Sequence, residues 1–564
     1  MAVILLGHHI LSPLGDGTAA NWQAILAGKT AMRLYENHFA SVEPFYASLF
    51  GELGKRGQEQ ESLFVSLCTY SAQEAIAQTG IDTHSERVLF ILSTTKGDNL
   101  DLLTPAQTIA DHFGNPNPPI IVSNACTSGV SAQVVAWRLL QTGEYDSIVL
   151  IGCDLQNQFI VSGFQSFKAL SAEPCRPFDK NRCGLNVGEA VATMVVGSVN
   201  YELRIMHYEG TCSHWVLEAG SIHNDANHIS GPSRTGEGCF RCLEDVIIGA
   251  NGKEGSRQVG VHTPSKYHGL VSVHGTATPY NDEMEAIALH RTGLDKAPIM
   301  ALKGYYGHTM GAAGILETIL ALRAAEEGIV PACKGYHECG TTFPLPVYSE
   351  NKPLVASSEP IVIKILSGFG GCNAAVKWRV FDNFTIDHAV NDYQIANCQI
   401  IMSVTIDSSC DLTALYRQYA GNYPKFFKMD TLARLGFIGV EMLMRKCEEQ
   451  HLPIPQNPAL VFGNRSASIK NDTDYLATIV NPEQYFPSPA LFVYTLPNIV
   501  TGEIAIRHKW HGETCFYVLP EEDQLLRLAE ITLRTTAHDS AIAGWVECTA
   551  NNNYFAHIQL LWKN

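Results

Sequence analysis

The chain has 564 residues, of which 46% are apolar and 17% charged, so it can bury the cores of more than one domain. It contains no run of about 18 uncharged apolar residues, so the sequence predicts no membrane-spanning helix. The formal net charge of −17 argues against nucleic acid as a partner. The 16 cysteines form no disulfide framework, and Cys239 and Cys242, a Cys-x-x-Cys pair, have no second pair at zinc spacing. We therefore expect reduced thiols, no metal and a cytoplasmic location.

Apolar strands alternate with helical stretches along the chain. Residues 1–17 have no basic flank or cleavage site, so we interpret them as a buried strand and a turn rather than a signal peptide. Further buried strands are predicted within 85–99, 146–156 and 189–202, and a helix within 311–328. This alternation is typical of an α/β fold with mixed or parallel sheets.

Cys126 stands between small residues where a strand gives way to a helix. The apolar run 120–122 ends just before it, and apolar residues then recur at the helical period through 130–140. The dipole and free N–H groups of a helix N-terminus favour thiolate over thiol. The sequence therefore predicts an activated cysteine nucleophile at this junction.

Three further stretches begin where an apolar strand ends. They are VHGTATPYNDEMEA from 273, LKGYYGHTMGAAGILE from 302 and SGFGGCNAA from 367. A single histidine in a loop is more often a structural residue than a functional one. Two glycine-flanked histidines, His274 and His308, together with a cysteine and a glycine-rich loop, are a much more specific pattern.

These four stretches together resemble the elongating β-ketoacyl-acyl-carrier-protein synthases, which have the thiolase fold. The resemblance covers residues 1–380 and rests on ACTSG around Cys126, HGTATPYND, KGYYGHTMGAAG, GFGGCN and RPFDKNRCGLNVGEA. It implies an α-β-α-β-α layered fold with two mixed five-stranded sheets. The sequence departs from the family at Ser367, where an aromatic residue is usual, and at Ala190, where glycine is usual. The Ser367 change is expected to reshape the acyl channel.

The resemblance implies a decarboxylative Claisen condensation. Cys126 takes the acyl group as a thioester and malonyl-acyl carrier protein supplies the extender, giving a β-ketoacyl-acyl carrier protein. His274 and His308, as neutral imidazoles, donate hydrogen bonds to the enolate oxygen that decarboxylation creates. The carbanion then attacks the acyl-Cys126, and the backbone N–H groups of Cys126 and Phe369 form the family's oxyanion hole for that step.

Supporting roles also follow from the resemblance. Lys303 pairs with Glu317, either as a structural ion pair or with a direct catalytic role. Asp282 is a structural acid of its loop, and so is Glu285.

The remaining site residues are expected to contact the substrate. Thr276 and Thr278 would hydrogen-bond the phosphopantetheine arm, or else cap their loop. Phe369 would gate the acyl channel, or else pack in the core. Gly368 and Gly370 would allow close backbone approach to the substrate.

The resemblance also implies partners. No tightly bound cofactor is expected, because phosphopantetheine arrives on the acyl carrier protein. A homodimer with its two nucleophile strands near the interface is expected, with other ketosynthase or dehydratase components of a pathway as further partners. An acidic carrier needs a local basic patch on this acidic chain, for which Lys55 with Arg56 and Lys180 with Arg182 are candidates.

The sequence after residue 395 repeats the order helix, strand and polar loop of the first part. Residues 430–476 match 62–103, and 536–549 echo 143–156. Counting along this repeat places Val518 or Leu519 where Cys126 stands, and Cys515 would lie in the preceding strand. We therefore predict a catalytic domain over 1–380 and, over 395–564, a degenerate ketosynthase N-terminal-like domain without a nucleophile.

The segment 485–515 resembles the family's dimer region and short ketosynthase-like proteins of polyene pathways. This appendage and the altered loop at Phe369 favour polyketide or aryl-polyene extension over primary fatty-acid elongation. Two alternatives stay open for the whole chain, a non-catalytic chain-length-factor-type subunit and a thiolase-like acyltransferase. The presence of Cys126 disfavours the first, and the order cysteine, histidine, histidine disfavours the second.

Overall fold

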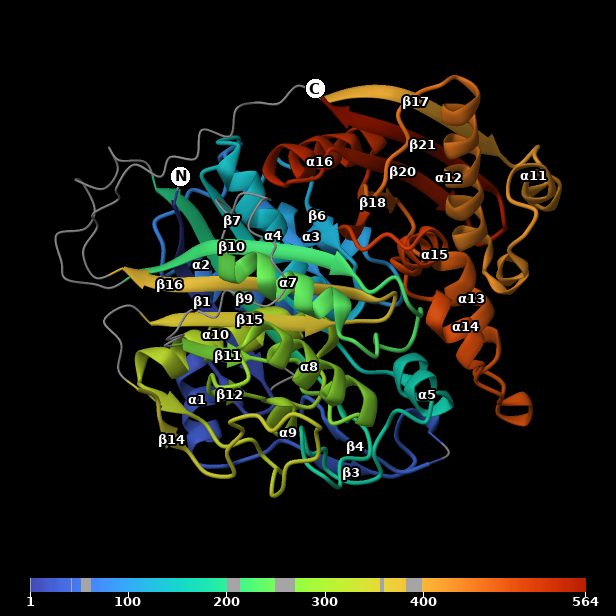
Figure 1. The fold of residues 1–564 in the computed structure, drawn as a ribbon. Helices are drawn as coiled ribbons and strands as arrows, with labels where there is room; N and C mark the ends of the chain where they lie inside the picture. Colours follow the sequence, from blue (N-terminus) through green and yellow to red (C-terminus); the bar gives the residue numbers. More distant parts are fainter. Residues whose placement is uncertain are drawn as a thin grey trace.

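A computed structural model of the chain describes residues 2–41, 43–51, 62–199, 214–248, 269–355, 360–381 and 398–564. Most of its strands join one mixed sheet of 16 strands that continues from the blue N-terminal part to the red C-terminal part (Figure 1). Apart from one short side strand, this sheet consists of three groups of five strands. The groups share one pattern of parallel and antiparallel neighbours, so the fold uses the same unit three times.

The first group contains the strand that precedes the nucleophile. Its order is β6 (Ile120–Val122), β5 (Val88–Ser93), β7 (Ser147–Asp154), β9 (Ala190–Val199) and β1 (Ala2–Ser12). The second strand, β5, is parallel to β6 and β7, and the pairs β7–β9 and β9–β1 are antiparallel. On one face of this group lie α2 (Leu63–Ile76) and α3 (Leu103–His112). On the other face lie α4 (Ser128–Gln141) and α10 (Ala313–Glu326).

The second group carries the histidine loop and the glycine-rich loop. Its order is β12 (Ile299–Met300), β11 (Gly269–Ser272), β15 (Ile361–Ser367), β16 (Cys372–Phe381) and β10 (His214–Asn224). It meets the first group where β1 pairs with β10, and α4 and α10 are packed between the two. Its outer face is covered by α7 (Glu237–Ile248) and α8 (Pro279–Thr292). This arrangement confirms the predicted α-β-α-β-α layers with two mixed five-stranded sheets.

The third group belongs to the C-terminal part of the chain. Its order is β19 (Thr514–Val518), β18 (Ala459–Asn464), β20 (Ser540–Cys548), β21 (Tyr554–Lys563) and β17 (Cys398–Asp407). As in the first group, the second strand is parallel to both neighbours and the last two pairs are antiparallel. The main helices of this unit are α12 (Thr431–Glu449), α15 (Ile499–His508) and α16 (Glu522–Thr535).

The first and third groups meet edge to edge. β19 pairs antiparallel with β6, with Tyr517 opposite Val122 and Val518 opposite Ile121. Outward from this junction the two groups therefore follow the same strand order in opposite directions. The edge of β6, which the implied homodimer would use, is occupied by the chain's own C-terminal unit.

Shorter elements complete the described chain. None of its helices combines the length and apolar character needed to cross a membrane. Two small sheets, β3–β4–β8 and β13–β14, lie beside the main sheet, and β2 pairs with β1. The bounds are β2 (Gly15–Asp16), α1 (Thr18–Leu26), β3 (Arg33–Tyr35), β4 (Phe45–Ser48), α5 (Gln158–Ser166), β8 (Val187–Gly188), α9 (Lys303–Tyr306), β13 (Ile329–Val330), β14 (Lys352–Pro353), α11 (Leu412–Tyr419), α13 (Ile469–Ala477) and α14 (Pro489–Tyr494), with 3-10 turns at His38–Ala40, Ala125–Thr127, Met310–Ala312, Pro424–Lys428 and Pro482–Gln484.

Two buried ion pairs connect the C-terminal unit to the rest. Arg138 of α4 donates two hydrogen bonds to Glu513, at 2.6 and 2.7 Å, and both side chains are almost fully buried. Lys96 Nζ lies 2.8 Å from Asp472 Oδ1 and also donates to the carbonyl of Thr495. Buried charges require partners, so these pairs show that the two units meet through an interior and not through a solvated surface.

The Arg138–Glu513 pair yields a stability prediction. Glu513→Gln should lower the free energy of unfolding by about 3–5 kcal/mol, because it leaves the buried Arg138 charge uncompensated. Urea denaturation followed by circular dichroism measures this loss. Arg138→Met combined with Glu513→Leu should recover most of it.

The matched control is the exposed pair Arg445–Glu449, with side chains 58% and 60% exposed. Glu449→Gln should change the stability by no more than about 1 kcal/mol. Equal effects of Glu513→Gln and Glu449→Gln would contradict a buried ionic junction.

Candidate active site

Cys126 lies in the 3-10 turn between β6 and α4. The glycine-rich loop passes directly over it. A Cβ atom on Gly368 would be 3.2 Å from the backbone nitrogen of Cys126, so this position has little room for a side chain. The absence of a side chain at Gly368 brings the Phe369 backbone N–H next to the sulfur, where it acts as a hydrogen-bond donor.

The structure brings both predicted histidines to this sulfur. The Cys126 Sγ and one ring nitrogen each of His274 and His308 all lie within 4.8 Å of one another. The two imidazole rings are nearly perpendicular, at 81°, with centroids 5.0 Å apart. Both histidines are buried, at 3% and 1% exposure. Three reactive side chains from three distant segments therefore share one enclosed space.

Hydrogen bonding assigns the tautomer of His308. The backbone N–H of Met310 donates to His308 Nδ1 at 3.2 Å, so this nitrogen carries no proton. The neutral ring then has its proton on Nε2, which is buried and has no hydrogen-bond partner within the described residues. Burial lowers the pKa of both His274 and His308 well below the ordinary value, and the charge of Lys303 lowers both further. Two uncharged imidazoles with unused ring nitrogens are suited to stabilise a developing oxyanion.

Two buried carboxylates support the His274 loop from behind. Glu285 accepts the backbone N–H groups of His274 and Gly275 at 2.6 and 2.7 Å. Asp282 accepts those of Phe178 and Ala277 at 2.7 and 3.1 Å. Burial raises the pKa of Glu285 to about 7 and that of Asp282 to about 6. Neither carboxylate joins the cluster of Cys126 with the histidines.

A buried triad of charges lies beside the histidines. Glu317 accepts from Lys303 at 2.6 Å and from Lys364 at 2.5 Å, and Lys364 also donates to the Val273 carbonyl at 2.9 Å. Burial alone raises the pKa of Glu317, but the two lysines bring it below the ordinary value. Burial lowers the pKa of Lys364 to about 8 despite Glu317. Two cations on one carboxylate leave net positive charge near the imidazoles, which helps to keep them neutral.

Sequence reasoning missed Lys364. It stands inside an apolar strand, IVIKILS, where a charged residue is costly unless it has a buried partner. This single lysine was the available signal for a buried ionic contact.

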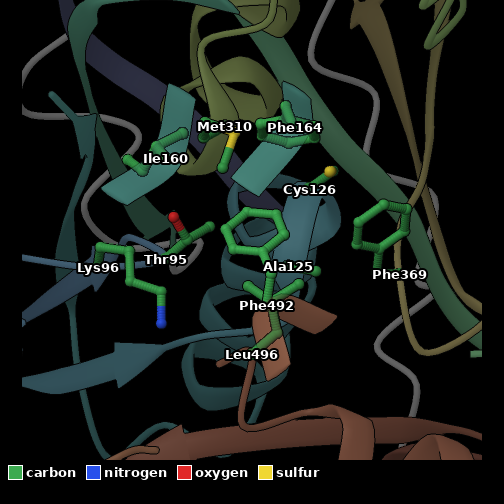
Figure 2. A pocket seen from close by; sticks show the side chains of 10 residues that line it. All are labelled: Thr95, Lys96, Ala125, Cys126, Ile160, Phe164, Met310, Phe369, Phe492 and Leu496. Atoms are coloured by element: carbon green, nitrogen blue, oxygen red, sulfur yellow. The ribbon is translucent and has the colours of Figure 1, made fainter. Parts of the chain in front are cut away.

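The sulfur of Cys126 faces a narrow apolar pocket (Figure 2). Phe492 and Leu496 belong to the C-terminal unit, and the Phe492 ring projects into the middle of the pocket lining. This ring also packs against Phe164, with centroids 5.6 Å apart. Both units therefore build the pocket. Its lining is Thr95, Lys96, Ala125, Cys126, Ile160, Phe164, Met310, Phe369, Phe492 and Leu496.

Family models match both halves of the catalytic part. The model described as "Beta-ketoacyl synthase, N-terminal domain" matches residues 2–200, and "Beta-ketoacyl synthase, C-terminal domain" matches 215–337. Cys126 lies in the first range, and His274 and His308 lie in the second. The chain belongs to the β-ketoacyl synthase family. It is accordingly an enzyme that forms carbon–carbon bonds.

Relatives of the synthase include a 3-oxoacyl-[acyl-carrier-protein] synthase and a polyketide synthase subunit. A 3-oxoacyl-[acyl-carrier-protein] synthase 2 of Coxiella burnetii is 27% identical over 432 residues, 67% of this chain and 99% of that one. The tetracenomycin polyketide synthase ketoacyl synthase alpha subunit of Streptomyces glaucescens is 26% identical over 428 residues, 66% of this chain and 96% of that one. A solved structure described as "PfaC Keto synthase-Chain length factor" superposes with a TM-score of 0.73 at 14% identity, covering 100% of this chain and 78% of that one. The fold likeness thus includes the C-terminal unit.

Two threonines of the synthase lie on the His274 loop. The hydroxyls of Thr276 and Thr278 are 3.0 Å apart, and Thr278 accepts the backbone N–H of Asn281 at 3.4 Å as the N-cap of α8. Neither lines the pocket below Cys126. Thr278 therefore has the capping role that we considered as its alternative.

The structure describes one of the two predicted basic patches, Lys180 with Arg182. Lys55 and Arg56 lie outside the described residues. Lys180 pairs with Glu338 at 3.1 Å on the surface. Arg182 donates to the Asp179, Gly340 and Pro279 carbonyls, which are 3.0, 2.6 and 2.9 Å away, so its charge is used to hold loops together.

The protonation state of Cys126 differs from our prediction. Burial raises the pKa of its thiol to about 12, and the opposing effects of Lys303 and of the Cys126 and Phe369 N–H groups are smaller. This raised pKa does not agree with the thiolate that the helix N-terminus predicts. The helix argument considered only local dipoles, whereas the aromatic walls of the pocket come from distant segments.

This raised pKa predicts the pH dependence of alkylation. The rate of reaction of Cys126 with iodoacetamide should rise about tenfold per pH unit up to about pH 9 without a plateau, because the thiolate fraction keeps growing below the pKa. Mass spectrometry of the Cys126 peptide measures the rate. Cys126→Ser corrects for other thiols, of which Cys183 is exposed. A plateau near neutral pH would contradict the raised pKa.

Proposed function

We propose that this synthase extends an acyl chain held on Cys126 with malonyl-acyl carrier protein, in a polyketide or aryl-polyene pathway. The observation that carries the proposal is the cluster of the Cys126 sulfur with two neutral histidines within 4.8 Å. The names of the relatives, a 3-oxoacyl-[acyl-carrier-protein] synthase and a polyketide synthase subunit, support it. The acyl groups arrive on the phosphopantetheine of the carrier protein, and we place the reaction in the cytoplasm.

The first half-reaction transfers the acyl group. The Cys126 sulfur attacks the thioester carbonyl, a new sulfur–carbon bond forms, and the phosphopantetheine sulfur leaves. The proton from Cys126 ends on that departing sulfur, which balances the exchange. The backbone N–H groups of Cys126 and Phe369 stabilise the negative oxygen of the tetrahedral intermediate.

The second half-reaction forms the carbon–carbon bond. The carboxylate of the malonyl group leaves as carbon dioxide, and its electron pair remains as an enolate. His308, with its proton on Nε2, and His274 donate hydrogen bonds to the enolate oxygen. The carbanion then attacks the acyl carbon and the sulfur–carbon bond of the acyl-enzyme breaks. The departing Cys126 sulfur takes up a proton from solvent.

The other site residues support these steps. Lys303 and Lys364 with Glu317 maintain the field that keeps both histidines uncharged. Thr276 lies on the His274 loop, within reach of a phosphopantetheine arm that approaches the histidines.

Residues 395–564 form a catalytically inactive half-domain that closes the acyl pocket of the domain over 1–380. The segment between β19 and α16, where the repeat would place a nucleophile, contains Leu519 and Pro520 and no thiol. Phe492 and Leu496 of this half-domain line the pocket. The homodimer stays a prediction, and it would need a surface other than the β6 edge.

Two other activities are less well supported. A chain-length-factor-type subunit needs no cysteine with two neutral imidazoles around it. A thiolase uses a second cysteine as its base, but Cys372, although in the glycine-rich loop, is 1% exposed and does not line the pocket. Other ketosynthase or dehydratase components remain expected partners of the pathway.

The acyl-enzyme is directly testable. Incubation with acyl-carrier proteins should add the mass of the acyl group to the Cys126 peptide of the native chain and to Cys183→Ala, but not to Cys126→Ala. Intact-protein and peptide mass spectrometry check this. A panel of saturated and conjugated acyl groups should show faster loading of the conjugated ones. Equal loading of Cys126→Ala would refute Cys126 as the nucleophile.

The pocket wall supplied by the C-terminal unit yields a further prediction. Phe492→Ala should lengthen the products by at least one extension cycle, because it removes the ring that projects into the pocket. Chromatography of released products measures chain length. Phe426→Ala is the matched control, because Phe426 is a buried phenylalanine of the same unit that does not line the pocket. An unchanged product spectrum for Phe492→Ala would show that this ring sets no limit.

A further inference from the structure

The glycine-rich loop after β15 is held by hydrogen bonds at nearly every peptide. Several of them come from the catalytic unit itself, and Asn498 of the C-terminal unit adds another. Those from the catalytic unit include Gly368 N–H to the Cys372 carbonyl at 2.8 Å, Gly370 N–H to the Ile229 carbonyl at 2.6 Å, Asn224 Nδ2 to the Gly370 carbonyl at 2.9 Å, Asp225 N–H to the Gly371 carbonyl at 2.7 Å, Asn373 Nδ2 to the Gly371 carbonyl at 3.1 Å and Cys372 Sγ to the Phe369 carbonyl at 3.2 Å.

The bond that crosses the junction comes from Asn498. Its Nδ2 donates to the Phe369 carbonyl at 2.8 Å and lies 3.5 Å from Cys372 Sγ. A carbonyl oxygen can only accept, so the amide must present its NH₂ group to Phe369. Its own Oδ1 is buried without a hydrogen-bond partner among the described residues, so the two contacts of Nδ2, with the Phe369 carbonyl and with Cys372 Sγ, orient the side chain.

Close packing fixes Asn498 against the loop. It is the N-cap residue of α15 and is 1% exposed. A Cβ atom on Gly370 would lie 2.6 Å from Asn498 Nδ2, and one on Gly502 would lie 2.6 Å from the Gly370 carbonyl oxygen. The φ of +87° at Gly370 also disfavours any other residue there. Helix α15 and the loop therefore touch backbone to backbone.

The hydrogen bond from Asn498 lies next to the peptide whose N–H group faces the nucleophile. The Phe369 N–H belongs to the peptide that follows Gly368, and it points at the Cys126 sulfur. No hydrogen bond to the Gly368 carbonyl occurs within the described residues. The orientation of this peptide is thus set by the peptides on either side. Asn498 holds the one after it at 2.8 Å, together with the Cys372 thiol, whose Sγ donates to the same Phe369 carbonyl at 3.2 Å.

We propose that Asn498 is a positioning residue, contributed by the C-terminal unit, that fixes the Phe369 peptide so that its N–H points into the oxyanion hole above Cys126. The inference rests on the proposed role of the Phe369 N–H in acyl transfer. In this proposal the C-terminal unit increases the rate of the reaction and also encloses the acyl chain. The proposal predicts different effects on the two half-reactions. Transfer to Cys126 uses the Phe369 N–H, whereas decarboxylation uses the histidine donors.

The test compares the two half-reactions in Asn498→Ala. The rate of Cys126 acylation should fall about tenfold, less than the ~10²–10³ that loss of an oxyanion-hole donor itself costs. Malonyl-carrier decarboxylation, followed as released carbon dioxide, should stay within about twofold of the native rate. Asn498→Asp, whose carboxylate oxygens repel the Phe369 carbonyl, should reduce acylation further. KM for the acyl carrier should not change.

Asn464→Ala is the matched control. Asn464 is another fully buried asparagine of the C-terminal unit, and its Nδ2 donates to the Ala467 carbonyl at 2.8 Å, away from the pocket. It should lose stability without altering the ratio of the two rates. If Asn498→Ala does not fold, Asn498→Ser, which keeps a small polar side chain, takes its place.

Three results are decisive. A selective fall in acylation supports the proposal. Unchanged acylation, or an equal fall in both rates as expected from general loosening of the fold, overturns it. If the native chain forms no acyl-Cys126, the proposed function fails as well, and that outcome is distinguished from failure of Asn498 alone by the native control.

Discussion

The structure depends on one short antiparallel pairing, in which Ile121 and Val122 of β6 lie opposite Val518 and Tyr517 of β19. This pairing sets the register between the two units. It brings Glu513 to Arg138, Asp472 to Lys96, Phe492 to the pocket and Asn498 to the glycine-rich loop. Because β6 leads directly into the turn that carries Cys126, the contacts of the C-terminal unit fall on the reacting centre.

Burial determines the protonation states of the catalytic side chains. Removal of water keeps the thiol protonated and both imidazoles neutral, and the net positive charge of Lys303 and Lys364 against Glu317 acts in the same direction on the histidines. The thiol and both imidazoles are therefore uncharged before the substrate binds. Its donors are fixed in advance and need little reorganisation when negative charge develops.

The sequence predicted what depends on local pattern. Apolar runs located β1, β5, β7 and β9, and the polar residues at strand ends located Cys126, His274 and His308. The layered α/β fold is confirmed. Three features could not be predicted from the sequence, because each depends on residues far apart in the chain. They are the raised pKa of the Cys126 thiol, the ion pair of Lys364 with Glu317, and the hydrogen bond of Asn498 with Phe369, which spans 129 positions. Composition and periodicity contain no information about such pairings.

The covalent connection between the two units has a consequence for how the synthase behaves in dilute solution. Two separate chains that meet along a strand edge fall apart as their concentration drops, and the mixture then contains half-built pockets. Here the second unit belongs to the same polypeptide, so its association with the first unit does not depend on the protein concentration. Every copy of the enzyme thus carries its own pocket wall in one-to-one ratio, whatever the level of synthesis.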